Sequence, residues 1–218
     1  MIPGNLRWAG EVATELPRAT AWRLRSYDGG LTWPECEKVA VWDSSHNFFG
    51  EVYILPFSDT HFLAATRITG DAARAIAGAP PIGVGGGAGG ETDEGMVLME
   101  SHDAGLHWSA PRWMDLGYSA VHVHLLKLTD GRILCAYRRR FLPFGVAAVL
   151  SEDNGKTWDT QHPIILGTRP TTYGGWPTSI ELADGTILTT RAYMTWPGAT
   201  FEAIRWQLPL PSEDYQGS

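Results

Sequence analysis

A short motif, Ser-x-Asp-x-Gly-x-x-Trp, occurs three times in this chain and constrains its fold more than any other feature. It reads SYDGGLTW at 26–33, SHDAGLHW at 101–108 and SEDNGKTW at 151–158. Three copies of one eight-residue pattern indicate a repeat protein, in which each small unit buries its apolar face against its neighbours. We therefore expect a fold built from repeated units.

The residue types of the motif suit a tight turn. An Asp side chain accepts hydrogen bonds from backbone N–H groups, and Gly supplies the positive φ that such turns need. Ser adds a local hydrogen bond, and Trp can fold back as an apolar plug between sheets. We expect a structural role for all three copies, because an active site would need only one. The Asp and Trp positions are Asp28, Trp33, Asp103, Trp108, Asp153 and Trp158.

A second repeated element lies between the motif copies. When Asp59, Asp130 and Asp184 are aligned, each lies at a turn between two apolar stretches, and a leucine follows four positions later. This pattern predicts a β-hairpin. With the motif and one closing strand, each repeat becomes a four-stranded antiparallel unit. Such units, repeated every several tens of residues, predict an all-β fold of the β-propeller type.

The number of repeats predicts about four blades, either as a small closed ring or as an arc of a larger one. One domain over 1–218 is expected to contain them, with a Gly-rich loop insertion at 80–95. Within that insertion Gly85, Gly87 and Gly90 match G-x-G-x-x-G by spacing. No helix opens after them and no βαβ unit surrounds them, so a dinucleotide site is not expected.

Composition excludes some classes of function. The formal net charge of −7 argues against a nucleic-acid partner, so an anionic ligand would need a local cluster of arginines. No apolar run is long enough for a membrane span, and no signal peptide is visible at the N-terminus. The two cysteines form neither a CxxC pair nor a disulfide framework. We expect no cofactor and no metal, and the cellular compartment stays open.

The motif copies resemble the Asp-boxes, or bacterial neuraminidase repeats, of the sialidase superfamily. The resemblance spans nearly the whole chain and implies a six-bladed propeller, of which this chain would hold an incomplete part. Asp-boxes are specific for this architecture but not for activity, because non-enzymatic propellers carry them as well. The stretch HLLKLTDGRILCAYRRRFLPFGVAAVLSEDNGKTWD is most similar to bacterial sialidase-like proteins.

The resemblance also implies two catalytic residues. Glu51 lies eight positions before Asp59, and Arg67 lies eight after it. In the family, the glutamate would polarise a nucleophilic Tyr, and the arginine would be one of three that bind the sugar carboxylate. A guanidinium binds a carboxylate through two parallel hydrogen bonds, and a Tyr nucleophile avoids the repulsion between a carboxylate and an anionic substrate.

Further residues are expected to bind substrate. Arg138 lies eight positions after Asp130 and is equivalent to Arg67, although a basic strand end at the sheet edge explains it equally well. His122 and His124 share a strand face and could line a sugar pocket; a metal pair is less favoured, since no third ligand has a recognisable spacing. Tyr173 and Trp176 could stack on sugar rings.

The chain also departs from the family pattern. The opening Arg-Ile-Pro strand, which supplies the first arginine, has no counterpart. The nucleophilic Tyr is expected eight positions before a late turn Asp, where this chain has His122 and Trp176. Two hypotheses follow: a sialidase-like glycoside hydrolase acting on an acidic sugar, or a non-catalytic propeller that binds a carbohydrate or a protein. Whether the chain is an enzyme stays open at this point, and its expected partner is a glycan.

Overall fold

The computed structural model describes residues 21–40, 48–69, 94–116, 120–169, 174–195 and 198–208. Within these residues the chain forms thirteen β-strands. The same residues contain no helix that is long and apolar enough to cross a membrane. The chain divides into two compact units, Met1–Val121 and His122–Ser218. The all-β expectation is confirmed for the described residues, whereas a single domain over 1–218 stays a prediction.

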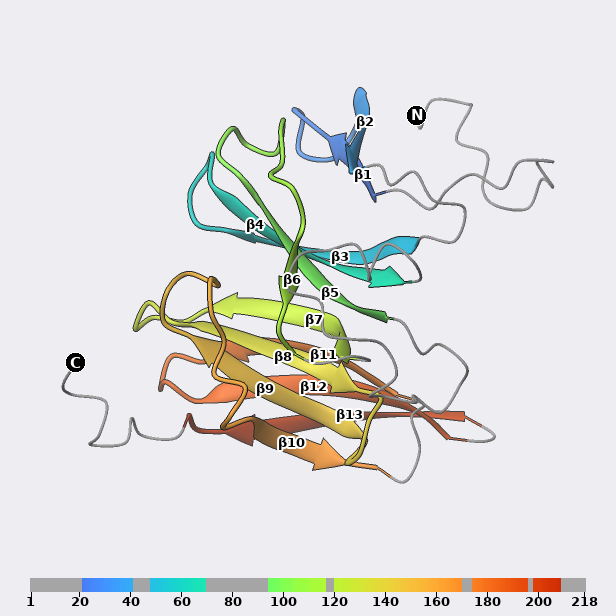
Figure 1. The fold of residues 1–218 in the computed structure, drawn as a ribbon, viewed down its shortest axis with the longest axis vertical. Coiled ribbons are helices and arrows are strands. Elements are labelled where there is room, and N and C mark those ends of the chain that lie inside the picture. The colour runs from blue at the N-terminus through green and yellow to red at the C-terminus, as the bar shows by residue number, and fades with distance from the viewer. Residues whose placement is uncertain are drawn as a thin grey trace. The chain divides into compact units, whose positions relative to one another are not determined.

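The first unit contains two antiparallel sheets (Figure 1, blue to green). One has two strands and the other has four, and in both the strands pair in chain order. The two-stranded sheet consists of β1 (Ala21–Arg25) and β2 (Glu35–Ala40); the four-stranded sheet consists of β3 (Phe48–Pro56), β4 (Phe62–Thr69), β5 (Glu94–Ser101) and β6 (Arg112–Met114).

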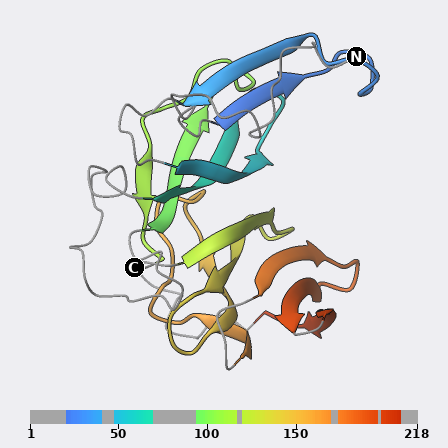
Figure 2. The same ribbon diagram turned by 90° about the vertical axis from the view of Figure 1, so that its right-hand side faces the viewer.

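The second unit also contains two sheets, each a simple meander (Figure 2, yellow-green to red). The first has the strand order β10-β9-β8-β7, and the second has the order β11-β12-β13. Their bounds are β7 (Ala120–Lys127), β8 (Ile133–Arg139), β9 (Gly145–Ser151), β10 (Ile164–Thr168), β11 (Gly175–Glu181), β12 (Ile187–Thr195) and β13 (Gly198–Trp206).

The hairpin turns confirm the alignment of the repeats. In each, a backbone N–H donates to the carbonyl oxygen four residues later at 2.8 Å: Phe57 to His61, Leu128 to Arg132, and Leu182 to Thr186. These pairs occupy the same positions relative to the aligned turn Asp residues. The predicted four-stranded antiparallel unit is present twice, as β3–β6 and as β7–β10.

An apolar core joins the two sheets of the second unit. Leu134 and Ala136 of β8 pack with Val146 of β9 and with Ile187 of β12, all fully buried. Ile204 and Trp206 of β13 cover the same cluster. Alternation along the strands directs these side chains to one face of each sheet, so the two sheets pack face to face.

The third motif copy shows how the Asp-box holds its turn. Ser151 Oγ donates to Asp153 Oδ1 at 2.9 Å and accepts the Gly155 N–H at 2.8 Å. Asp153 also accepts the backbone N–H of Thr157 at 2.8 Å and its hydroxyl at 2.7 Å. Gly155 has a φ of 82°, and Asn154 before it has 59°. These hydrogen bonds all lie within the box and hold its turn.

The other two copies repeat these bonds with one exchange. Asp28 accepts the N–H and hydroxyl of Thr32 at 2.9 and 2.6 Å. Asp103 accepts the N–H of His107 at 2.8 Å, and the His107 ring Nδ1 lies 2.6 Å from its other oxygen. Histidine thus takes the place of threonine in the second box.

The tryptophans of the first two boxes pack on their own turns. Trp108 Nε1 donates to the Gly105 carbonyl at 3.2 Å, and a Cβ on Gly105 would lie 3.4 Å from the Trp108 ring. Trp33 is still 40% exposed. The expectation of a plug between sheets is therefore too strong for the first box, where the ring covers its turn and leaves one side to solvent.

Most of the predicted insertion at 80–95 lies outside the described residues, but its end does not. Glu94 and Gly95 already belong to β5. A Cβ on Gly95 would lie 2.1 Å from the Trp113 ring of the neighbouring strand β6, so glycine leaves the space that this ring fills. The last two residues of the predicted insertion therefore belong to a strand.

Candidate functional site

The first strands of three sheets share an unusual backbone position. Glu51 in β3, His122 in β7 and Trp176 in β11 have φ values of 55°, 53° and 43°, in the left-handed region that non-glycine residues rarely adopt. All three lie eight positions before the aligned turn Asp. The pairing register shifts beside Glu51 and beside Trp176, as in a β-bulge. Bulges re-aim side chains, and such strain gathers at functional sites.

In the first unit this position forms an ion pair. Glu51 Oε1 lies 3.1 Å from Arg67 Nη1 of the next strand, β4, where Arg67 pairs with Gly50. Arg67 is only 8% exposed, whereas the Glu51 carboxylate is partly open to solvent. A buried guanidinium needs a hydrogen-bonded partner of opposite charge, and the bulge turns Glu51 toward it.

In the second unit the equivalent position forms a cluster of three side chains. Arg138 Nη1 lies 3.1 Å from His122 Nε2, which repeats the relation of Arg67 to Glu51. The Arg138 guanidinium also lies 5.1 Å from the centre of the Trp176 ring, and the His122 and Trp176 rings are 5.1 Å apart. Because the guanidinium donates, His122 Nε2 accepts and the ring carries its proton on Nδ1.

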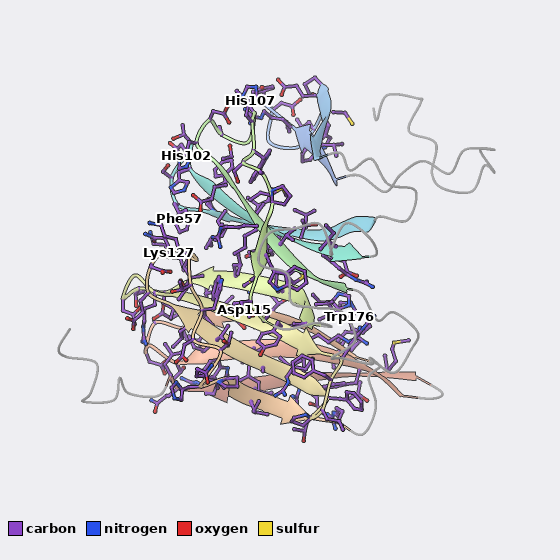
Figure 3. All side chains as sticks on the ribbon, viewed as in Figure 1. Phe57, His102, His107, Asp115, Lys127 and Trp176 are labelled. Carbon is purple, nitrogen blue, oxygen red and sulfur yellow. The ribbon has the colours of Figure 1, made fainter. Side chains whose placement is uncertain are left out.

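A glycine makes room for this cluster. A Cβ on Gly175, which has a φ of 131°, would lie 2.7 Å from Cγ of Arg138. Arg138 is 4% exposed, while Trp176 is 44% exposed and lies at the end of its strand in Figure 3. The cluster thus combines a buried cation, a group that can bind a carboxylate, with an exposed aromatic face, a surface on which an apolar ring face can stack.

His124 has a different environment from His122. Its Nδ1 accepts the backbone N–H of Ser179 in β11 at 3.3 Å. Burial lowers the pKa of His124, so its ring is neutral at neutral pH. Both histidines therefore contact strand β11, but His124 uses one ring nitrogen for a bond to backbone. Tyr173, the remaining predicted residue, lies outside the described residues.

The second and third Asp-boxes lie at the other end of their sheets from the strained positions Glu51 and His122. In the first unit the loop of the second box (101–108) contacts the β3–β4 turn, where the Ala104 N–H donates to the Thr60 carbonyl at 2.9 Å.

The Asp side chains of the boxes have lowered pKa values. Hydrogen bonds from Thr32 and Ser26 lower the pKa of Asp28 to about 2. The pKa of Asp103 is lowered as well, chiefly by hydrogen bonds from the His107 backbone N–H and ring. For Asp153, burial opposes the charge, but bonds from Thr157 and Ser151 outweigh it and bring the pKa to about 2.

Sequence reasoning missed a second arginine cluster in the second unit. Arg191 of β12 donates from Nε and Nη2 to Glu202 Oε2 of β13 at 2.9 and 2.6 Å, and from Nη1 to the Leu166 carbonyl at 2.8 Å. Arg169 contacts the other oxygen of Glu202 and lies 4.2 Å from the centre of the Tyr193 ring. Arg191 lies one position before the residue aligned with Arg67, so a search that allowed a shift of one residue would have found it.

Comparisons with known proteins agree with this architecture. Residues 82–189 match the family model described as a BNR repeat-like domain. A crystal structure of a protein of unknown function from Dyadobacter fermentans superposes with a TM-score of 0.63 at 22% identity, over 85% of this chain and 45% of that one. No curated protein matches the chain significantly.

A second solved structure is the intramolecular trans-sialidase from Ruminococcus gnavus in complex with oseltamivir carboxylate. It superposes with a TM-score of 0.52 at 10% identity, over 85% of this chain and 63% of that one. The chain thus spans less than two thirds of the length of either structure. The repeated boxes, the matched family model and the two superpositions support a sialidase-like fold of the BNR-repeat type for this chain.

Proposed function

We propose that the chain is part of a β-propeller of the six-bladed sialidase type. In this proposal β3–β6 and β7–β10 are two blades, and β11–β13 supply three strands of another. The face-to-face packing of the two sheets in the second unit supports it, since blades of a propeller pack in this way. The range 1–218 would then be one propeller domain, with the glycine-rich loop inserted in a blade.

We further propose that the protein is a sialidase-like glycoside hydrolase that acts on an acidic sugar of the sialic-acid type. The observation that carries this proposal is the pair of Glu51 and Arg67, 3.1 Å apart at a strained backbone position. Arg67 would bind the sugar carboxylate, and Glu51 would be the carboxylate that polarises the nucleophile. The trans-sialidase that the fold resembles was crystallised with a carboxylate-bearing ligand.

The second unit would supply substrate-binding residues. Arg138 offers a second guanidinium for an anionic group, and the exposed ring of Trp176 offers a stacking surface. His122 fixes the orientation of Arg138 through its ring nitrogen. His124 and Tyr173 complete the proposed set, in which His124 is held by the Ser179 backbone.

The second candidate is a carbohydrate-binding protein without catalysis, and a specific observation favours it. His122 and Trp176 occupy the aligned positions at which the family's nucleophilic Tyr is expected. Their rings contact each other and Arg138, which suits binding of a sugar rather than attack on it. Protein–glycan recognition by such a cluster needs no nucleophile.

Hydrolysis of a fluorogenic sialoside distinguishes the two candidates. The enzyme proposal predicts turnover by the purified chain, and a fall in kcat/KM of about 100-fold or more in Glu51→Gln and Arg67→Ala. Glu152→Gln is the matched control, because Glu152 is an exposed glutamate of the third box and should keep full activity.

Uronic-acid glycosides serve as a second substrate class, and a glycan array measures binding alone. Absence of turnover on both classes, together with binding of sialylated glycans that weakens in Arg138→Ala, would establish the non-catalytic candidate. If the chain shows no turnover and binds no glycan, both candidate functions are overturned.

A further inference from the structure

A cluster of two histidines and a glutamate lies at the turn end of the four-stranded sheet in the first unit. Glu100 Oε2 lies 3.6 Å from His61 Nε2 and 3.7 Å from His102 Nε2. One possible ligand atom from each of the three residues lies within 4.8 Å of those of the other two. From this geometry we propose that His61, Glu100 and His102 bind a divalent transition-metal ion of the zinc type.

The distances suit a metal better than direct hydrogen bonds. At 3.6 and 3.7 Å, the contacts to the Glu100 carboxylate are longer than a hydrogen bond to a histidine ring. Tetrahedral ligands on zinc, with bonds of about 2.0–2.2 Å, lie about 3.4 Å apart. A small rotation of His102, whose side chain is 70% exposed, would bring the three atoms to that spacing.

One ring nitrogen of the cluster lacks a partner. The Nε2 of His61 is shielded from solvent and has no hydrogen-bond partner among the described residues. Leaving a buried polar atom unsatisfied costs stability, and a metal ion at the centre of the cluster would remove that cost. Neutral imidazole nitrogen and carboxylate oxygen are both ligands that zinc accepts, and three protein ligands leave a fourth position for water.

Contacts around the cluster hold the His61 side of it in place. Ser58 Oγ accepts the N–H of His61 at 3.0 Å, and the Phe57 ring lies 4.7 Å from the His61 ring. The rings of His61 and His102 stack with centroids 4.3 Å apart. Figure 3 shows Phe57 and His102 at the same end of this sheet. A ligand that is already held in place, as His61 is, lowers the cost of binding an ion.

The backbone of Glu100 is tied to the box loop as well. Glu100 is joined to Ser109 by bonds in both directions: its carbonyl accepts the Ser109 N–H at 2.8 Å, and its N–H donates to Ser109 Oγ at 3.0 Å. Its second oxygen, Oε1, lies 3.8 Å from Arg112 Nη2. Oε2 can therefore bind a metal ion while Oε1 faces the arginine.

The internal repeats show that the scaffold does not require these residues. At the positions aligned with His61, Glu100 and His102, the third box and its hairpin have Arg132, Leu150 and Glu152. That repeat forms the same turn, with Leu128 N–H bonded to Arg132 carbonyl, and the same box bonds around Asp153. The ligand set is therefore specific to one repeat, which argues against a purely structural origin.

The site is separate from the proposed sugar site and does not depend on it. His61 precedes β4, and Arg67 lies six residues further along, about 20 Å in an extended strand. A metal ion here would connect the β3–β4 turn to the Asp-box loop.

Isothermal titration of the chain with zinc chloride tests the proposal. The chain should carry no polyhistidine tag and should be treated with a chelator and dialysed first. We expect one zinc ion per chain with a micromolar or tighter Kd, and an increase in the thermal midpoint when zinc is added. Cobalt(II) in place of zinc should give the visible absorption of a low-coordinate site.

Three variants decide whether the binding belongs to this cluster. His102→Gln and Glu100→Gln should each weaken binding about tenfold or more. His102→Gln should fold normally, because the side chain is exposed. His107→Thr is the matched control: it removes a histidine of the same loop but restores the threonine of the other boxes, so zinc affinity should stay within about twofold.

The opposite results would overturn the proposal. No heat of binding with zinc up to about 100 μM, or a zinc affinity that is unchanged in His102→Gln, would reduce the cluster to two histidines stacked beside a carboxylate. Activity on sialosides plays no part in this test, so the metal site and the proposed function can fail independently.

Discussion

The Asp-box turns, or box ends, and the strained first-strand positions, or bulge ends, follow different rules. At the Asp-box end, Ser, Asp and Gly recur in three copies and make the same hydrogen bonds at nearly the same distances. At the bulge end, the backbone conformation recurs but the side chains are Glu51, His122 and Trp176. Residue identity is retained where a side chain holds the turn, and it varies where the backbone only presents a side chain. The comparison therefore separates structural residues from candidate ligand-binding residues within one chain.

The second box combines both kinds of residue, those retained in every repeat and those that vary. It keeps the Ser101, Asp103 and Gly105 bonds of the motif, yet the residues around them include His61, Glu100 and His102. Box residues that are the same in every repeat hold the loop, and neighbouring positions that differ between repeats are available for a further role.

The largest effect on stability is expected at the box end. Asp153→Ala removes the acceptor of the Thr157 N–H and hydroxyl and leaves Ser151 without its acceptor, which should lower the free energy of unfolding by about 2 kcal/mol. Urea denaturation measures this change. Asp28→Ala in the more exposed first box is the comparison and should cost less. Equal losses in the two boxes would show that burial does not govern their contribution.

A smaller effect on stability is expected at the bulge end. Its sign shows whether the backbone at that position is strained. Because Trp176 has a φ of 43°, Trp176→Gly should be more stable than Trp176→Ala by about 1 kcal/mol. The same pair of substitutions at Thr178, two residues along the strand, should give the ordinary order, in which Ala is the more stable. Thermal unfolding of the four variants measures both differences. The same order at both sites would mean that position 176 is not strained.

The smallest effect is the acid sensitivity of the boxes. Asp28 and Asp153 have folded pKa values of about 2, below the ordinary value of 3.8. A depressed folded pKa stabilises the fold above the unfolded pKa, and that contribution disappears as the pH falls through the folded value. The thermal midpoint should therefore fall between about pH 4 and pH 2. Asp153→Asn cannot titrate at this position, so its midpoint should fall less over that range; an identical slope would contradict the assignment.

Much of this division could be predicted from the sequence, because the box and the hairpin are local. Ser151, Asp153 and Gly155 bond within five residues, so their spacing alone indicates the turn. The alignment of Asp59 with Asp130 also placed Arg67 and Arg138 at equivalent positions. Each of them contacts the residue with a left-handed φ in its sheet, Glu51 or His122.

Other features could not be predicted, because they depend on contacts between distant segments. The left-handed φ of Glu51 has no glycine to signal it. Arg169 and Arg191 meet at Glu202, which lies 33 residues from the first and 11 from the second. His61 and His102 come from two different turns, and only the pairing of β4 with β5 brings them together.

Chemical-shift mapping with free sialic acid tests most directly whether the bulge ends bind ligand while the boxes only hold the fold. The account predicts that saturating sialic acid shifts the backbone amide signals around Glu51, Arg67, His122, Arg138 and Trp176. The signals of the Asp-box turns at 26–33, 101–108 and 151–158 should stay within the spread of the remaining residues. Shifts confined to the box turns, or no shift at any of the five residues Glu51, Arg67, His122, Arg138 and Trp176, would contradict the account.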